Sequence, residues 1–133
     1  MADPVFRTPS TNPFGLTDPG SNTSPTFADI DNDGDLDAFV GERNGNTLFY
    51  RNTGTASSPV FTVASTNPFD LTAVGYEANP TLVDIDGDGD LDAFFGNRFG
   101  NILFYRNSST AGDPVFYNSQ HESFWFNECR SVC

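Results

Sequence analysis

The chain has 133 residues, enough for one ordinary domain or a small repeat array but too few for two independent enzymatic domains. Its formal net charge is −12, and ten of its 18 acidic residues lie in two short segments, 29–37 and 84–92. The other acidic residues nearly balance the 6 basic ones. The acidity is therefore local, which favours a cation as partner and argues against nucleic acid.

A repeat of 55 residues organises the elements that the sequence predicts. Comparing residues 4–58 with residues 59–113 gives identity at 34 of 55 positions. Pro4-Val5-Phe6 recurs twice at this spacing, as Pro59-Val60-Phe61 and as Pro114-Val115-Phe116. The sequence therefore encodes a duplicated unit, and whatever one acidic segment does the other should also do.

In chain order, the first expected element is an extra strand at Pro4 to Thr8, which matches the last strand of a unit whose other strands are missing. Each unit is then predicted to form a four-stranded antiparallel meander, because short apolar runs are bounded by Gly, Asn, Asp and Pro without a helical period. The expected strands are Pro25 to Ala28, Ala38 to Gly41, Thr47 to Arg51 and Val60 to Ala64, then Pro80 to Val83, Ala93 to Gly96, Ile102 to Arg106 and Val115 to Tyr117.

Tight turns and connectors separate these strands. Asn44-Gly45-Asn46 and Phe99-Gly100-Asn101 are typical of hairpin turns, in which glycine adopts a positive backbone angle. The chain accordingly divides into an orphan outer strand with its connector (1–24), a first unit (25–64), a connector (65–79), a second unit (80–119) and a C-terminal tail (120–133).

A single meander cannot bury both of its faces, so we expect the two units to stack face to face. The aromatic side chains predicted to lie inside are Phe27, Phe39, Phe49, Phe94 and Phe104. The tail contains Phe124-Trp125-Phe126 and resembles nothing in the repeat. It either caps the last unit or pairs with the orphan strand of the same or a neighbouring chain.

The acidic segments have the composition of calcium-binding loops. Five aspartates within nine residues repel one another unless a cation lies among them. Alternating carboxylates around a glycine suit Ca²⁺, which takes six to eight oxygen ligands, better than Mg²⁺, which keeps its waters and needs a smaller site. The predicted ligands are the side chains of Asp29, Asp31, Asp33 and Asp37 with the carbonyl of Asp35, and the side chains of Asp84, Asp86, Asp88 and Asp92 with the carbonyl of Asp90.

The pattern Asp-h-Asp-x-Asp-Gly-x-x-Asp, followed by apolar residues and Gly41 or Gly96, resembles the FG-GAP repeat of integrin alpha subunits and its bacterial relatives with VCBS-type repeats. The resemblance covers about residues 25–117. It implies tandem β-propeller blades, with calcium in the loop between the first two strands of each blade. It also implies a non-enzymatic extracellular protein that acts in adhesion, in binding carbohydrate or protein, or as a scaffold.

The chain departs from that family in its number of repeats. Propellers close with about four to eight blades, and two cannot form a ring, so the chain is either part of a longer propeller or assembles with other copies. The leading hypothesis is a non-catalytic, calcium-stabilised structural protein that self-associates head to tail into a ring or filament.

The alternative is an adhesin or lectin-like module that binds a glycan or a cell-surface protein, with Tyr76 and Phe99 as candidate contacts because they replace Ser21 and Asn44. An enzyme is disfavoured, because the single histidine, His121, lies in the tail.

Other features bear on the compartment. No apolar run approaches the roughly 20 residues that a membrane-spanning helix needs, so we expect no membrane span. Two sequons, at Asn22 and Asn107, are compatible with glycosylation outside the cell. Cys129 and Cys133 can form a local disulfide, bridge to another chain, or remain free.

Overall fold

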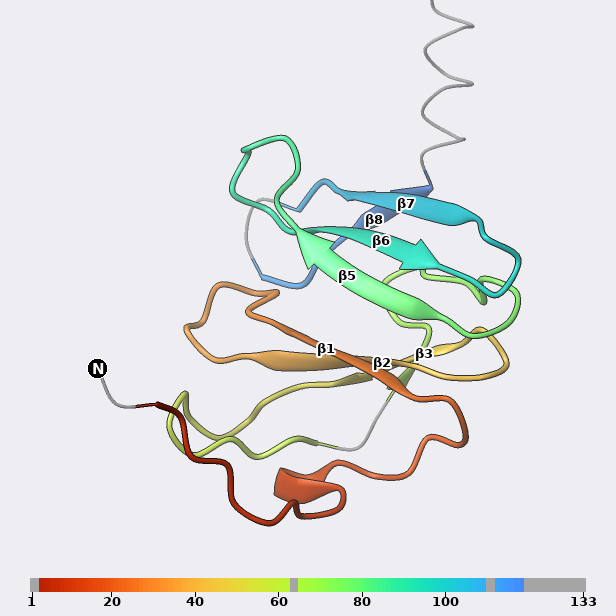
Figure 1. Cartoon of the computed structure of the whole chain (residues 1–133). Coiled ribbons are helices and arrows are strands. Elements are labelled where there is room, and N and C mark those ends of the chain that lie inside the picture. Colours follow the sequence, from red (N-terminus) through yellow and green to blue (C-terminus); the bar gives the residue numbers. More distant parts are fainter. Residues whose placement is uncertain (1–2, 63–64, 110–111, 119–133) are drawn as a thin grey trace, which may run out of the picture.

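The computed structural model describes residues 3–62, 65–109 and 112–118. Two four-stranded antiparallel sheets are stacked one above the other, as Figure 1 shows. The first sheet has the order β1-β2-β3-β4 and comprises Ser24–Ala28, Asp37–Gly41, Thr47–Tyr50 and Ser65–Thr66. The second has the order β5-β6-β7-β8 and comprises Asn79–Val83, Asp92–Gly96, Ile102–Asn107 and Phe116–Asn118. The all-β fold of two tandem four-stranded units is therefore confirmed.

The two sheets repeat one another in register. Phe39 pairs with Phe49 between β2 and β3, and Phe94 pairs with Phe104 at the same place between β6 and β7. The rings of each pair lie against each other, with centroids 4.9 Å and 4.7 Å apart. Cross-strand aromatic pairs of this kind stabilise a sheet beyond its backbone hydrogen bonds.

The outer strand expected at Val60 to Ala64 is described only as far as residue 62. This part runs antiparallel to the end of the third strand, since Phe61 bridges Asn52 and the Thr62 N–H group donates to the carbonyl of Arg51 at 2.9 Å. The Oδ1 of Asn52 accepts hydrogen bonds from the backbone N–H groups of Gly54 and Val60 and so closes the loop between them. Beyond residue 64, β4 pairs with β3.

The extra strand expected at Pro4 to Thr8 does not form. Residues 3–10 have no regular secondary structure and are exposed. Within the described residues no third strand of a preceding unit is present to pair with them, so their backbone lacks the ladder that a strand requires. The segment that follows contains a short 3₁₀ turn, η1, at Pro13–Gly15.

The main core lies between the two sheets, where both contribute apolar side chains. One face of the first sheet presents Phe39 and Phe49, and the opposing face of the second presents Ala93, Phe95 and Tyr105. The connector between the units completes this core with Leu71, Val74 and Ala78. A smaller cluster on the far face of the first sheet contains Ala38, Val40, Tyr50 and Phe61, with Leu16 from the N-terminal segment packed against it.

The prediction of core aromatics was right for Phe39 and Phe49 and wrong for three other residues. Phe27 is exposed, and its ring lies tilted against that of Phe61 at a centroid distance of 6.0 Å. Phe94 and Phe104 are only half-buried, because they lie on the face of the second sheet that points away from the first. No helical segment among the described residues has the length and hydrophobicity needed to cross a membrane.

We expect Phe95→Ala to lower the free energy of unfolding by about 3–5 kcal/mol, because it empties a fully buried site between the sheets. Phe99→Ala is the matched control: this ring is exposed, so its loss should cost less than about 1 kcal/mol. Urea unfolding followed by circular dichroism measures both. Equal effects of the two changes would contradict the assignment of the core to the space between the sheets.

Candidate metal centre

Each acidic loop connects the first strand of a unit to the second and folds around its first aspartate. In the first loop, the two carboxylate oxygens of Asp29 accept the backbone N–H groups of Asp33 and Gly34, both at 3.0 Å. In the second, Asp84 accepts the equivalent groups of Asp88 and Gly89 at 3.1 Å and 2.9 Å. The two loops therefore share the same conformation, and in each loop it is set by backbone hydrogen bonds to the first aspartate.

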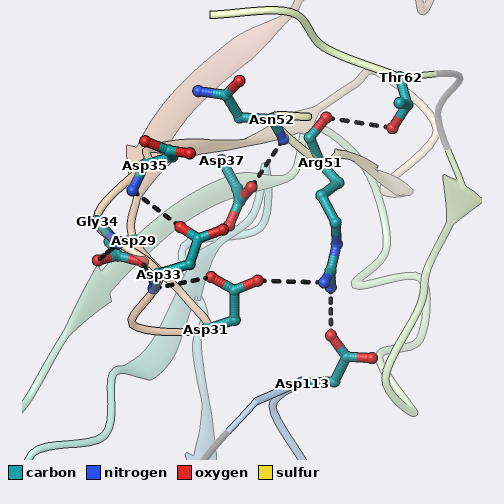
Figure 2. A network of polar contacts seen from close by, with 10 residues as sticks. All are labelled: Asp29, Asp31, Asp33, Gly34, Asp35, Asp37, Arg51, Asn52, Thr62 and Asp113. Carbon is teal, nitrogen blue, oxygen red and sulfur yellow. Dashed lines mark hydrogen bonds and ion pairs between the residues drawn. The ribbon is translucent and has the colours of Figure 1, made fainter. Parts of the chain in front are cut away.

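This folding gathers three carboxylates in each loop. Oxygens of Asp29, Asp31 and Asp33 lie within 4.8 Å of one another, and so do those of Asp84, Asp86 and Asp88. Each triplet could hold a metal ion, because carboxylate oxygens at this spacing are suitable ligands for a hard cation. Figure 2 shows the first triplet converging on one side of the loop.

The remaining predicted ligands, Asp35 and Asp37 in the first loop and Asp90 and Asp92 in the second, lie outside these triplets. The backbone N–H groups of Asp35 and Asp90 donate to the third carboxylate of their triplets, at 2.8 Å and 2.9 Å. Asp37 and Asp92 are completely buried at the starts of β2 and β6. Their carboxylates are held by the backbone N–H groups of Asn52 and Asn107, at 2.8 Å and 2.9 Å.

Asp37 is the side chain that most clearly indicates a cation. Its Oδ1 accepts the Asn52 N–H group, whereas its Oδ2 is buried and accepts no hydrogen bond from the described part of the chain. Burial, with a smaller contribution from the nearby carboxylates of Asp31 and Asp33, raises the pKa of the Asp37 carboxyl to about 6. A buried carboxylate oxygen without a donor is costly, and a cation beside it would remove that cost. The residues present therefore fit a hard, oxygen-ligated metal ion.

The environment differs among the carboxylates of the loops. The backbone N–H group of Gly89, with those of Gly87 and Asp88, holds the pKa of Asp84 below its usual value. Partial burial, followed by repulsion from Asp33, raises the pKa of Asp31. Hydrogen bonds to the charged form of the carboxylate thus outweigh the effect of burial at Asp84, whereas burial and repulsion prevail at Asp31.

An arginine lies beside each loop, a feature that the sequence reasoning did not identify. The Arg51 guanidinium donates to Asp31 at 3.1 Å and also pairs with Asp113 of the second unit, as Figure 2 shows. The equivalent Arg106 lies 3.7 Å from Asp86. The signal was present in the repeated run Leu-Phe-Tyr-Arg-Asn, since its arginine pairs with the second aspartate of the loop and its asparagine anchors the last.

The remaining predicted sites are placed as follows. Asn22 is exposed, and its side-chain amide donates to Glu77 at 2.9 Å. Asn107 is buried, and its Oδ1 accepts the N–H groups of Ser109 and Val115, so the folded unit leaves no access for a glycan there. Cys129, Cys133 and His121 lie outside the described residues.

The fold and the loops together define a class: a repeat protein built from tandem four-stranded sheets, each with an aspartate-rich loop between its first two strands. Residues 29–95, half of the chain, match the family model described as FG-GAP-like repeat. The chain belongs to this family, as the resemblance had indicated. Neither a curated protein nor a solved structure matches it.

We expect Gly89→Ala to lower the free energy of unfolding by about 1–2 kcal/mol, because Gly89 has φ of 92° in the second loop, where a side chain is strained. Gly87→Asn is the control that the chain itself supplies: Asn32 occupies the equivalent position of the first loop with φ of 60°. Its effect should stay within about 0.5 kcal/mol. Thermal unfolding of the two variants measures this difference, and a larger loss for Gly87→Asn would contradict the common loop conformation.

Proposed function

We propose that this chain is a non-catalytic, calcium-binding structural repeat protein that self-associates head to tail, as a ring or filament, outside the cell. Membership of the FG-GAP-like repeat family indicates a structural or binding repeat module, and such repeats are typically non-catalytic and typical of extracellular proteins. The choice of calcium, the self-association and the location are the parts that the proposal adds.

One observation carries the calcium assignment: a buried carboxylate oxygen of Asp37 has no donor within the described residues and lies beside a triplet of further carboxylates. The first loop offers side-chain oxygens from Asp29, Asp31, Asp33 and Asp37 and the carbonyl of Asp35. The second offers the equivalent atoms of Asp84, Asp86, Asp88, Asp92 and Asp90. Each loop offers oxygen ligands in a number that suits Ca²⁺, which takes six to eight, better than Mg²⁺, which keeps several of its waters.

The metal would stabilise the fold more than perform chemistry. The loop joins two adjacent strands, so an ion bound there fixes their spacing and neutralises the repulsion among the aspartates. Binding to the folded chain alone adds the binding free energy to the stability. Because Asp37 begins β2 and accepts the N–H group of Asn52 after β3, an ion bound to Asp37 would also fix the ends of these two strands.

A titration of the metal-free chain with Ca²⁺ tests the two sites. We expect two ions per chain, and Asp37→Asn should weaken the first site at least about tenfold, because it removes a charged ligand without changing the side-chain shape. Asp35→Asn is the control, since the proposed ligand there is the backbone carbonyl and should be retained. Calorimetry that shows no binding, or that shows equal losses for both variants, would overturn the assignment.

Self-association can be tested by measuring the mass of the protein with and without calcium. In millimolar Ca²⁺ we expect light scattering to give a mass of several chains, which falls on addition of excess chelator because the loops no longer hold the units rigid. A closed ring should give one discrete mass, corresponding to about four to eight units, whereas a filament should give a broad distribution that grows with protein concentration. A monomer in both conditions would sink the self-association.

A specific observation keeps the adhesin or lectin-like module as a second candidate. Tyr76, in the connector between the units, and Phe99, in the turn between β6 and β7, form an exposed aromatic pair with ring centroids 6.0 Å apart in an edge-on arrangement. Such a pair offers a surface on which a sugar or an apolar side chain of a cell-surface protein can stack. A small discrete species that is retained saturably on a glycan surface, and released by Tyr76→Ala, would favour this candidate over the structural one.

A further inference from the structure

The interface between the two units inside one chain provides a template for contact between chains. We call the face of each unit that carries its paired phenylalanines the leading face: Phe39 and Phe49 in the first unit, Phe94 and Phe104 in the second. The opposite face, with Tyr50 in the first unit and Tyr105 in the second, is the trailing face. Within the chain, the leading face of the first unit packs on the trailing face of the second.

Equivalent residues on the two leading faces differ sharply in exposure. Ile30 is 4% exposed and its counterpart Ile85 is 57% exposed, whereas Thr47 is 1% exposed and its counterpart Ile102 is 76% exposed. The sequences of the two faces are almost the same. The difference in exposure arises because the second unit covers Ile30 and Thr47, whereas no unit covers Ile85 and Ile102 within the described residues. The leading face of the second unit is thus an exposed apolar surface, whereas the equivalent face of the first unit is buried against the second unit.

The trailing face of the first unit has a matching cavity. A cavity of about 330 Å³ is lined there by Leu16, Val40 and Tyr50, among others. Their counterparts in the second unit, Leu71, Phe95 and Tyr105, belong to the core that also contains Ile30, Phe39 and Phe49. The cavity therefore lies where side chains of a preceding leading face would pack.

The N-terminal segment already has the conformation that such docking needs. Asn67 and Phe69, in the connector, have φ of 47° and 61°, and Phe69 packs edge-on against Phe49 with centroids 5.1 Å apart. Asn12 and Phe14, 55 residues earlier, have the same φ values, yet Phe14 is 59% exposed. The Phe14 carbonyl accepts the Phe61 N–H group at 2.8 Å, so the chain itself holds this backbone conformation and leaves the Phe14 ring exposed for a contact like that of Phe69.

Asn67 also shows which polar contacts would accompany this docking. Its N–H group donates to the carbonyl of Thr47 at 2.7 Å, and its Oδ1 accepts the Thr47 N–H group at 2.8 Å. The equivalent pair is Asn12 of one copy and Ile102 of another. Asn12 has no strand edge to bond in this way within the described residues of its own chain.

We infer that a second copy of this chain docks its trailing face on the leading face of the second unit in the register of the internal interface, so that Phe14 of one copy contacts Phe104 of the next. The inference rests on the proposed self-association and adds the two faces and their register. Because the faces differ, the contact is heterologous and extends head to tail. Ile85 lies between Asp84 and Asp86, so an ion that orders the second loop also orders part of the docking face.

A complementation experiment tests the register in the full chain with Ca²⁺ present. Phe14→Arg blocks the trailing face and Ile102→Arg blocks the leading face, and both side chains are exposed, so the fold should be unaffected. Each variant alone should raise the protein concentration at half-association at least about tenfold. An equimolar mixture should form a species of two chains, because each variant retains the face that the other lacks.

Phe99→Arg is the matched control, because its counterpart Asn44 stays exposed in the internal interface; its mass should equal that of the wild type. Phe104→Arg, checked for folding by circular dichroism, should repeat the result of Ile102→Arg. If the single variants keep the wild-type mass, or if their mixture stays monomeric, this register is overturned while self-association itself can stand. A monomeric wild type whose Trp125 fluorescence changes on Ile102→Arg would assign the face to the chain's own tail and overturn both.

Discussion

The structure depends on one constraint: a four-stranded sheet has two faces, and a chain of two sheets can cover only two of the four. The faces between the units form the main core, where Phe39 and Phe49 meet Phe95 and Tyr105. The outer face of the first sheet is partly covered by the N-terminal segment through Leu16. The outer face of the second leaves Ile102 in solvent. Stacking by repetition satisfies each sheet only while another unit follows.

The acidic loops are connected to this packing through the backbone. Ile30, between Asp29 and Asp31, is buried in the core between the sheets, so the loop that gathers the carboxylates also anchors the interface. Asp37, the first residue of β2, connects the other end of the loop to the end of β3, because its carboxylate accepts the backbone N–H group of Asn52. Repulsion among the aspartates would loosen both connections, and neutralising that repulsion would tighten both. The electrostatics of the loop and the packing of the sheets are therefore coupled.

Much of the fold and of the candidate site could be predicted because the signals are local. Short apolar runs between glycine and aspartate define β1 to β3 and β5 to β7 almost to the residue. Phe94 and Phe104 could not be placed in this way, because the same residue types are buried in one unit and half-buried in the other. The sequence could not show that the sequon at Asn107 is inaccessible, because the burial of Asn107 depends on a loop that folds around its side chain and donates to it from Ser109 and Val115.

The sequence by itself determined the repeat, its strands and the gathering of aspartates, because strand propensity, turn residues and ligand spacing all act over a few neighbouring positions. Only the tertiary structure decided which face of each sheet is covered, because that depends on units 55 residues apart. It also decided that Asp37 is buried with one oxygen that accepts no hydrogen bond from the described residues, and that Arg51 connects Asp31 to Asp113. These features arise where strands and loops from distant parts of the chain meet.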